Sequence, residues 1–149
     1  MDRPRILVVD DDQAIRATVQ AILEDEGYTV DVATTGKEAV TKTEEEIYNV
    51  ALLDIRLPDM EGVELLRLMK DQIPKIRKIM ITGYPSIQNA VEAVNKNADA
   101  YLIKPVDVEV LLKTVKEQLR KQEDEKAFSE DKVAAFIDSR VKEMTINHV

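Results

Sequence analysis

The sequence contains no cysteine, only four glycines and a single histidine in 149 residues. Without cysteine the chain has no disulfide, no thiolate nucleophile and no thiolate metal ligand, which is typical of a reducing compartment. No apolar run approaches the roughly 18–20 residues that a bilayer span requires, and no signal-peptide core follows Met1-Asp-Arg-Pro4. We therefore expect a cytoplasmic protein without membrane attachment.

The scarcity of glycine argues against nucleotide-dependent enzymes. Such enzymes need a glycine-rich phosphate loop after a strand. None of the four glycines lies in a loop of this kind; they are Gly27, Gly36, Gly62 and Gly83. A flavin site would need a hydroxyl- or glycine-rich loop after the first strand, where this chain has residues Asp10, Asp11 and Asp12. The lone histidine, His148, lies in a polar stretch, and we expect it to be inert.

Acidic residues outnumber basic ones, giving a net charge of -8 and a pI of about 4.8. An acidic chain gains nothing from releasing counterions of a phosphate backbone, so we expect no direct nucleic-acid binding. The length and the 44% hydrophobic content suit one domain with a substantial core, plus an appendage.

Five apolar runs alternate with helical periodicity along the chain. The pattern predicts strands at residues 6–9, 28–33, 50–53, 78–82 and 99–103, and helices at 13–26, 36–46, 62–72, from Ser86 onward, and from Asp107 to about Leu119. This alternation indicates an α/β fold with helices on both faces of a parallel sheet. We expect a flavodoxin-like, doubly wound, five-stranded sheet in the order 2-1-3-4-5.

We expect the domain to comprise residues 1–121 and the segment after it to form a further helix. Residues 122–128 are polar and indicate a linker or a helix extension, and Ser129 is placed as the N-cap of an amphipathic helix over 129–147. Its apolar stripe recurs at about 3.5 residues and comprises Val133, Phe136, Ile137, Val141 and Met144. We expect this stripe to pack against the domain's own surface, the same helix of a second chain in a homodimer, or an output protein.

Four predicted strands end in reactive or charged residues. Asp10 and Asp11 follow the first, Asp54 ends the third, Thr82 the fourth, and Lys104 follows the fifth. In a parallel sheet these ends share one edge, where three converging carboxylates would repel one another without a cation such as Mg²⁺. A carboxylate beside that cation suits attack on phosphorus. Each signal alone is common, since a strand-end aspartate often caps a turn.

The motifs Ile6-Leu-Val-Val-Asp-Asp11, Leu53-Asp-Ile-Arg-Leu-Pro-Asp-Met-Glu-Gly62, Met80-Ile-Thr-Gly83 and Ala100-Tyr-Leu-Ile-Lys-Pro105 together resemble the response-regulator receiver domain of two-component signalling. The resemblance covers about residues 4–121. It implies that Asp54 is the phosphoacceptor and that Asp11, Asp54 and the backbone carbonyl of Arg56 ligate Mg²⁺. Asp10 would act largely through water, while Asp12 is better read as a helix cap.

The resemblance also implies a donor and a switch. The phosphoryl group would come from a histidine kinase, a phosphotransfer protein or a small acyl phosphate. Thr82 would move toward the phosphate and Tyr101 would turn inward behind it. Arg56 and Tyr84 would tune the lifetime of the phosphate. Such a protein is a signalling phosphoacceptor and catalyses only its own phosphotransfer and dephosphorylation.

The output is open at this point. About 28 residues follow residue 121, too few for a DNA-binding or catalytic domain. We expect a stand-alone receiver that acts through protein–protein contacts. The alternatives are the N-terminal receiver fragment of a larger transcriptional regulator and a receiver fold that serves as a phosphorylation-independent interaction module.

Overall fold

The computed structural model describes residues 3–69, 71–83, 86 and 98–147. At its centre lies a five-stranded parallel sheet in the order β2-β1-β3-β4-β5. The strands are β1 (Arg5–Val9), β2 (Thr29–Ala33), β3 (Val50–Asp54), β4 (Arg77–Thr82) and β5 (Ala100–Ile103). The predicted fold class and strand order are confirmed, with strand limits differing by about one residue.

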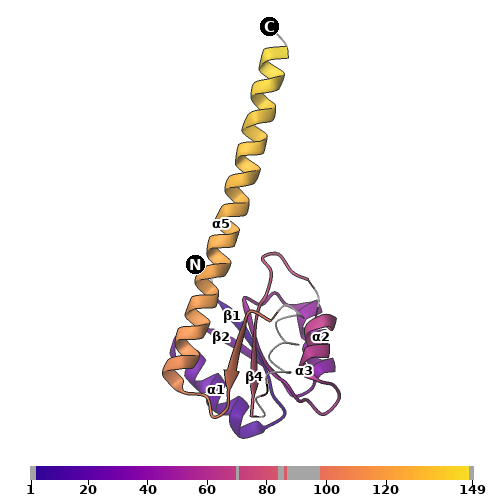
Figure 1. Ribbon diagram of the computed structural model, residues 1–149, viewed down its shortest axis with the longest axis vertical. Coiled ribbons are helices and arrows are strands. Elements are labelled where there is room, and N and C mark those ends of the chain that lie inside the picture. Colours follow the sequence, from indigo (N-terminus) through magenta and orange to yellow (C-terminus); the bar gives the residue numbers. More distant parts are fainter. Residues whose placement is uncertain (1–2, 70, 84–85, 87–97, 148–149) are drawn as a thin grey trace.

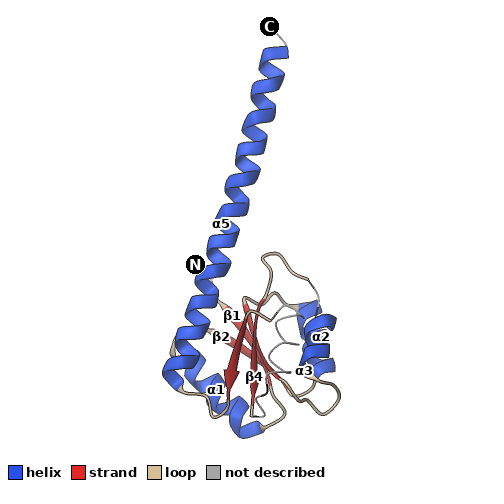
Figure 2. Ribbon diagram, in the orientation of Figure 1, coloured by secondary structure: helices blue, strands red, loops and turns tan. Residues whose placement is uncertain are grey.

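Helices cover both faces of the sheet (Figures 1 and 2). Helices α1 (Gln13–Asp25) and α5 (Val108–Asn147) pack on one face, and α2 (Gly36–Glu45) and α3 (Gly62–Leu68) on the other. Strand side chains alternate between the two cores, so that Ile6 contributes to the α1–α5 core and Leu7 to the α2–α3 core. Every residue of β3 is buried, as expected for the central strand of a parallel sheet.

Polar side chains begin the first two helices. The Asp12 carboxylate accepts a hydrogen bond from the Ile15 amide and caps α1, which confirms the capping interpretation of this third aspartate. Thr35 caps α2 in the same way. Gly27, at a φ of +96°, follows α1 as a residue in the left-handed region, in agreement with the predicted stop.

The helix predicted over 62–72 is shorter than expected. It is α3, and it ends at Leu68. Gln72 lies outside the helix, and its side-chain amide donates to the backbone carbonyls of Thr43 and Glu46 at the end of α2. These contacts satisfy carbonyls that the end of a helix leaves without partners. The helix predicted to follow Ser86 lies outside the described residues.

Residues 108–147 form one continuous helix, so the prediction of a new helix start at Ser129 is wrong. The polar run before Ser129 is rich in Lys, Glu and Gln, which favour helix, and the Lys121–Glu117 and Arg120–Asp124 pairs bridge successive turns. Residues 122–128 are therefore a helix extension rather than a linker.

The far half of α5 extends well away from the sheet and its covering helices (Figure 1). Its stripe (Val133, Phe136, Ile137, Val141 and Met144) is 54–60% exposed, so the expectation that it packs on the domain's own surface is not met. Within the described residues, no helix combines the length and the apolar character needed to span a membrane.

Candidate functional site

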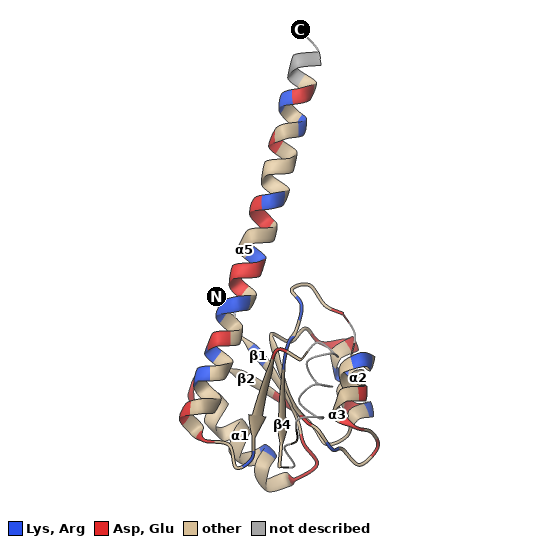
Figure 3. Ribbon diagram, in the orientation of Figure 1, with Lys and Arg blue, Asp and Glu red and all other residues tan. Residues whose placement is uncertain are grey.

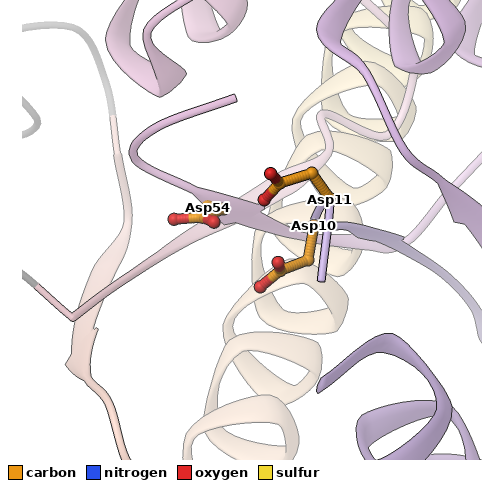
Figure 4. Close-up of side chains that lie close together, drawn as sticks. All are labelled: Asp10, Asp11 and Asp54. Atoms are coloured by element: carbon orange, nitrogen blue, oxygen red, sulfur yellow. The ribbon is translucent and has the colours of Figure 1, made fainter. Parts of the chain in front are cut away.

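Three carboxylates converge at the carboxyl ends of β1 and β3 (Figure 4). Asp10 follows β1, Asp54 ends β3, and the two strands are paired directly, with Val9 opposite Leu53. One oxygen each of Asp10, Asp11 and Asp54 lies within 4.8 Å of the others. Asp10 and Asp54 are buried and Asp11 is exposed, so the cluster opens to solvent on one side.

Backbone amides hold one oxygen of each buried carboxylate. The Asp12 amide donates to Oδ1 of Asp10 at 2.9 Å, and the Arg56 amide donates to Oδ1 of Asp54 at 3.3 Å. Both amides belong to the residue two positions further along, as in an Asx turn. The second oxygen of each carboxylate is thereby directed toward Lys104.

Lys104 supplies positive charge to this cluster. Its Nζ lies 2.8 Å from Oδ2 of Asp10 and 3.2 Å from Oδ2 of Asp54. Burial and the charge of Asp10 raise the pKa of Asp54 against the opposing effect of Lys104. Burial lowers the pKa of Lys104, but its two carboxylate partners outweigh that effect, so the pKa is raised overall. One ammonium thus faces three carboxylates.

The surroundings fit a divalent cation. The cluster lines a hollow of about 540 Å³ whose walls are Asp10, Asp11, Asp12, Ile15, Asp54, Arg56, Gly83 and Lys104. Carboxylate oxygens at low count, with open space for water, are the donors that Mg²⁺ prefers in proteins. The excess of negative charge adds an electrostatic reason for a cation to bind there.

The remaining predicted site residues lie around this hollow. Thr82 ends β4, is fully buried, and accepts the Lys104 amide hydrogen bond through its carbonyl at 2.7 Å. Tyr101 packs partly buried against the α2–α3 core, and its enclosed hydroxyl has no hydrogen-bond partner within the described part of the chain. Arg56 lines the hollow, whereas Tyr84 lies outside the described residues.

Two residues that the sequence did not single out for a role shape the loop after β3. The Gly62 amide donates to the Ile55 carbonyl at 2.6 Å, and a Cβ on Gly62 would overlap the backbone carbonyl oxygen of Asp54. The carboxylate of Asp59 accepts from the amides of Gly36 and Lys37, both at 2.9 Å. These hydrogen bonds lower the pKa of Asp59 and attach the loop to the start of α2.

An apolar groove lies beside the site. It runs between α1 and the segment joining β5 to α5, and it is lined by Ala14, Ile15, Thr18, Val19, Ile22, Lys104, Pro105, Val106 and Leu111. Lys104 and Ile15 border both the groove and the acidic hollow. An approaching protein that filled the groove would therefore stand next to Asp54.

A doubly wound sheet with an acidic cluster and a lysine at its switch point defines a receiver-type signalling domain. The family model for the response regulator receiver domain matches residues 6–116, and the chain belongs to this family of two-component signalling proteins. The receiver-domain expectation is thus confirmed.

Similar proteins agree with this assignment. A receiver domain protein from Methanospirillum hungatei is 49% identical, with a TM-score of 0.77 over 83% of this chain and 99% of that one. A Burkholderia pseudomallei response regulator, described with a phosphorylated aspartic acid and a calcium ion, is 32% identical, with a TM-score of 0.69 over 85% of this chain and 74% of that one.

The transcriptional regulatory protein ZraR of Klebsiella oxytoca is 41% identical over 114 residues. These residues are 76% of this chain but only 26% of that regulator. The chain thus spans about a quarter of the length of this curated relative, and the rest of ZraR has no counterpart in the match.

Proposed function

We propose that Asp54 accepts a phosphoryl group from the phosphohistidine of a histidine kinase or phosphotransfer protein, or from a small acyl phosphate. The observation that carries this proposal is the convergence of Asp10, Asp11 and Asp54 beside the Lys104 ammonium. An Asp54 carboxylate oxygen forms a bond to phosphorus while the P–N bond of the phosphohistidine breaks. The imidazole nitrogen leaves with the electron pair.

Asp11, Asp54 and the Arg56 carbonyl are the proposed ligands of Mg²⁺, with Asp10 acting largely through water. Bound Mg²⁺ would supply positive charge that offsets both the carboxylate repulsion and the charge of the incoming phosphoryl group. Lys104 then pairs with one phosphoryl oxygen, from a position already within 3.2 Å of Asp54. These charge contacts do most of the work in phosphoryl transfer.

The response to phosphorylation is proposed to pass through Thr82 and Tyr101. The Thr82 hydroxyl donates to a phosphoryl oxygen, and Tyr101, which lies on the neighbouring strand, changes its packing against the core. Arg56, which lines the hollow, and Tyr84, which follows Thr82 by two residues in the sequence, are proposed to tune the lifetime of the phosphate. The chain itself catalyses only its own phosphotransfer and dephosphorylation.

The proposed donor is a cytoplasmic protein that docks on the apolar groove beside the site. The groove shares Lys104 and Ile15 with the acidic hollow, so a donor helix seated there would bring its phosphohistidine toward Asp54. An exposed apolar surface next to a reactive centre is typical of a protein-binding site.

For the output we propose contacts with a partner protein, not direct contact with nucleic acid. A second proposal is that the chain works as the receiver of a larger transcriptional regulator. The observation that favours it is the match of this chain to about a quarter of ZraR.

Labelling with acetyl phosphate and Mg²⁺ tests the assignment. We expect one acid-stable, hydroxylamine-labile phosphoryl group by mass spectrometry on the wild type and none on Asp54→Asn. Asp12→Asn is the matched control, because asparagine keeps the helix cap while removing a neighbouring carboxylate. Equal labelling of Asp54→Asn and the wild type would refute the proposal. A phosphorylation-independent module would show no labelling of either protein.

A further inference from the structure

The acidic hollow around Asp54 and the apolar groove beside it meet at Ile15 and Lys104, which border both. Nζ of Lys104 lies 3.2 Å from Oδ2 of Asp54, so the groove begins within one side-chain length of this carboxylate. Because the ammonium of Lys104 is directed at the carboxylates, its methylene stem is left to line apolar surface. A small molecule bound in the hollow can therefore extend directly into the groove.

The walls of the hollow are apolar on one side only. Among the described residues that line it, Ile15 has the only apolar side chain, and the others are four aspartates, Arg56, Gly83 and Lys104. An apolar chain placed against the carboxylates would displace their water without offering a hydrogen bond in return, which costs free energy. The apolar part of a bound molecule is thus best accommodated past Ile15, in the groove.

The groove has the size and the lining of a site for a small apolar group. Its volume of about 500 Å³ lies in the range of pockets that hold small molecules, and Lys104 is the only charged residue among the described ones that line it. The first part of α1, which forms one wall, carries a single charge between Gln13 and Ile22, that of Arg16 (Figure 3). The Arg16 guanidinium donates to the Asp10 backbone carbonyl at 2.9 Å, and Arg16 does not line the groove.

We propose that the groove is an acyl subsite, which binds the apolar chain of an acyl phosphate while the phosphoryl group lies in the hollow against Asp54. This inference rests on the proposed function and names the class of its small donor, an acyl phosphate with a chain longer than acetyl. An Asp54 oxygen forms a bond to phosphorus, the bond from phosphorus to the bridging oxygen breaks, and the acyl carboxylate leaves with the electron pair. The protein donor is an alternative, because either donor must place its phosphoryl group against the same carboxylate.

The length of the acyl chain should change binding and leave the chemistry unaltered. Acetyl and butyryl phosphate release carboxylates of almost equal basicity, and the butyryl chain is longer by two methylene groups. Burying one methylene group fully strengthens binding about fourfold, so two that are half buried strengthen it about fourfold in all. Because the subsite holds the chain equally before and during transfer, the gain should appear in the KM of the donor, with the maximal rate unchanged.

Rates of Asp54 labelling in the full chain test the subsite, measured by mass spectrometry with Mg²⁺ over a concentration range of each donor. We expect the KM of butyryl phosphate to be about fourfold lower than that of acetyl phosphate. Labelling by acetyl phosphate with no gain for butyryl phosphate would overturn the subsite and leave the proposed function standing. Labelling of Asp54 by neither donor would overturn both.

The variant Ala14→Glu places a carboxylate in the acyl subsite. Ala14 is exposed, lines the groove and lies in the first turn of α1, where a negative charge suits the helix. Ala17→Glu is the matched control, because it adds the same charge at an exposed position of α1 that does not line the groove. Both donors carry the same phosphoryl charge, so the ratio of their KM values isolates the acyl chain. We expect Ala14→Glu to abolish the difference between the donors and Ala17→Glu to keep it, and equal ratios in the two variants would overturn the proposal.

An unreactive analogue locates the acyl chain without phosphorylation. The analogue 2-oxopentylphosphonate has a CH₂ group in place of the bridging oxygen of butyryl phosphate, and 2-oxopropylphosphonate is the corresponding analogue of acetyl phosphate. With Mg²⁺ present, the longer analogue should shift the amide NMR signals of Thr18 and Ile22, in the groove, more than the shorter one does. Equal shifts for the two analogues, or differences confined to residues outside the groove, would overturn the proposal.

Discussion

Nζ of Lys104, which follows β5, lies 3.2 Å from Oδ2 of Asp54 at the end of β3, although β4 separates these two strands in the sheet. The ammonium also contacts Asp10 at 2.8 Å. In the proposed reaction, this ammonium would exchange a carboxylate oxygen for a phosphoryl oxygen with little movement. The Lys104 backbone amide also donates to the Thr82 backbone carbonyl, so the backbones of these two residues are held together.

We predict that Lys104→Ala and Thr82→Ala still accept some phosphoryl group on Asp54 but lose the response at Tyr101. The reason is that charge pairing and hydroxyl donation stabilise the consequence of transfer, whereas the nucleophile remains. NMR shifts of Tyr101 on adding beryllofluoride and Mg²⁺ measure the response. Lys37→Ala removes an exposed lysine away from the hollow and should respond like the wild type. Equal responses in all four proteins would reject this role.

Magnesium should raise the melting temperature of the wild type. A cation that binds only the folded state at one hundred times its Kd stabilises it by about 2.7 kcal/mol. Asp11→Asn removes one proposed ligand with little change in volume and should shift the titration to higher Mg²⁺ concentrations. Thermal unfolding at several Mg²⁺ concentrations provides the comparison, and superimposable titrations for the two proteins would argue against Asp11 as a ligand.

Asp59 should stabilise the folded protein at neutral pH but not in acid. Because hydrogen bonds from Gly36 and Lys37 lower the pKa of Asp59 below its usual 3.8, its ionised form stabilises the folded state. That stability is present above pH 3.8 and is lost as the pH falls through the lowered folded value. Asp59→Ala should therefore melt below the wild type at pH 7, with the gap closing in acid.

Thermal melts of both proteins from pH 7 to pH 2.5 measure this gap. Asp59→Asn, which keeps one acceptor oxygen and has no charge to titrate, should show an intermediate melting temperature at pH 7. A gap between the wild type and Asp59→Ala that stayed constant across the series would show that the charge of Asp59 contributes nothing.

Substituting Gly62 should damage both stability and phosphorylation. The added Cβ would overlap the backbone carbonyl oxygen of Asp54, and overpacking of this kind costs about 1–3 kcal/mol. Gly83→Ala is the matched control, because its Cβ would come no closer than 3.8 Å to Lys104. Chemical unfolding and acetyl phosphate labelling of both variants give the comparison. A Gly62→Ala variant as stable as Gly83→Ala would contradict the close approach.

The sheet and the acidic cluster were predictable because short-range signals determine them. Buried parallel strands appear as apolar runs, and the residues that end them must meet at one edge. Hence Asp10, Asp11, Asp54 and Lys104 converge as the sequence predicted. The assignment of Asp12 to a cap followed from its place just before a helical pattern.

The errors have tertiary causes. Gln122 looks solvated in a polar run, yet it is 2% exposed and bonds to the backbone carbonyls of Asn49 and Lys75. No local pattern distinguishes such a glutamine from an exposed one. The same long-range contacts, together with residues that favour helix, stabilise α5 over residues 122–128, where the sequence suggested an interruption. A chain truncated at Lys121 would consequently lose part of the receiver's own packing.

Helix α5 connects the site to a point far outside the receiver. The helix begins four residues after Lys104, at the edge of the sheet formed by the carboxyl ends of the strands, and leaves the receiver past Gln122 at the opposite edge. About 25 further residues then form a rigid lever of roughly 37 Å. A tilt of about 10° at the base would sweep its tip through roughly 6 Å, comparable to one helical turn. A displacement of Val108 is thus enlarged about 1.8-fold at the tip, because α5 extends roughly 37 Å beyond Gln122 but only roughly 21 Å from Val108 to Gln122.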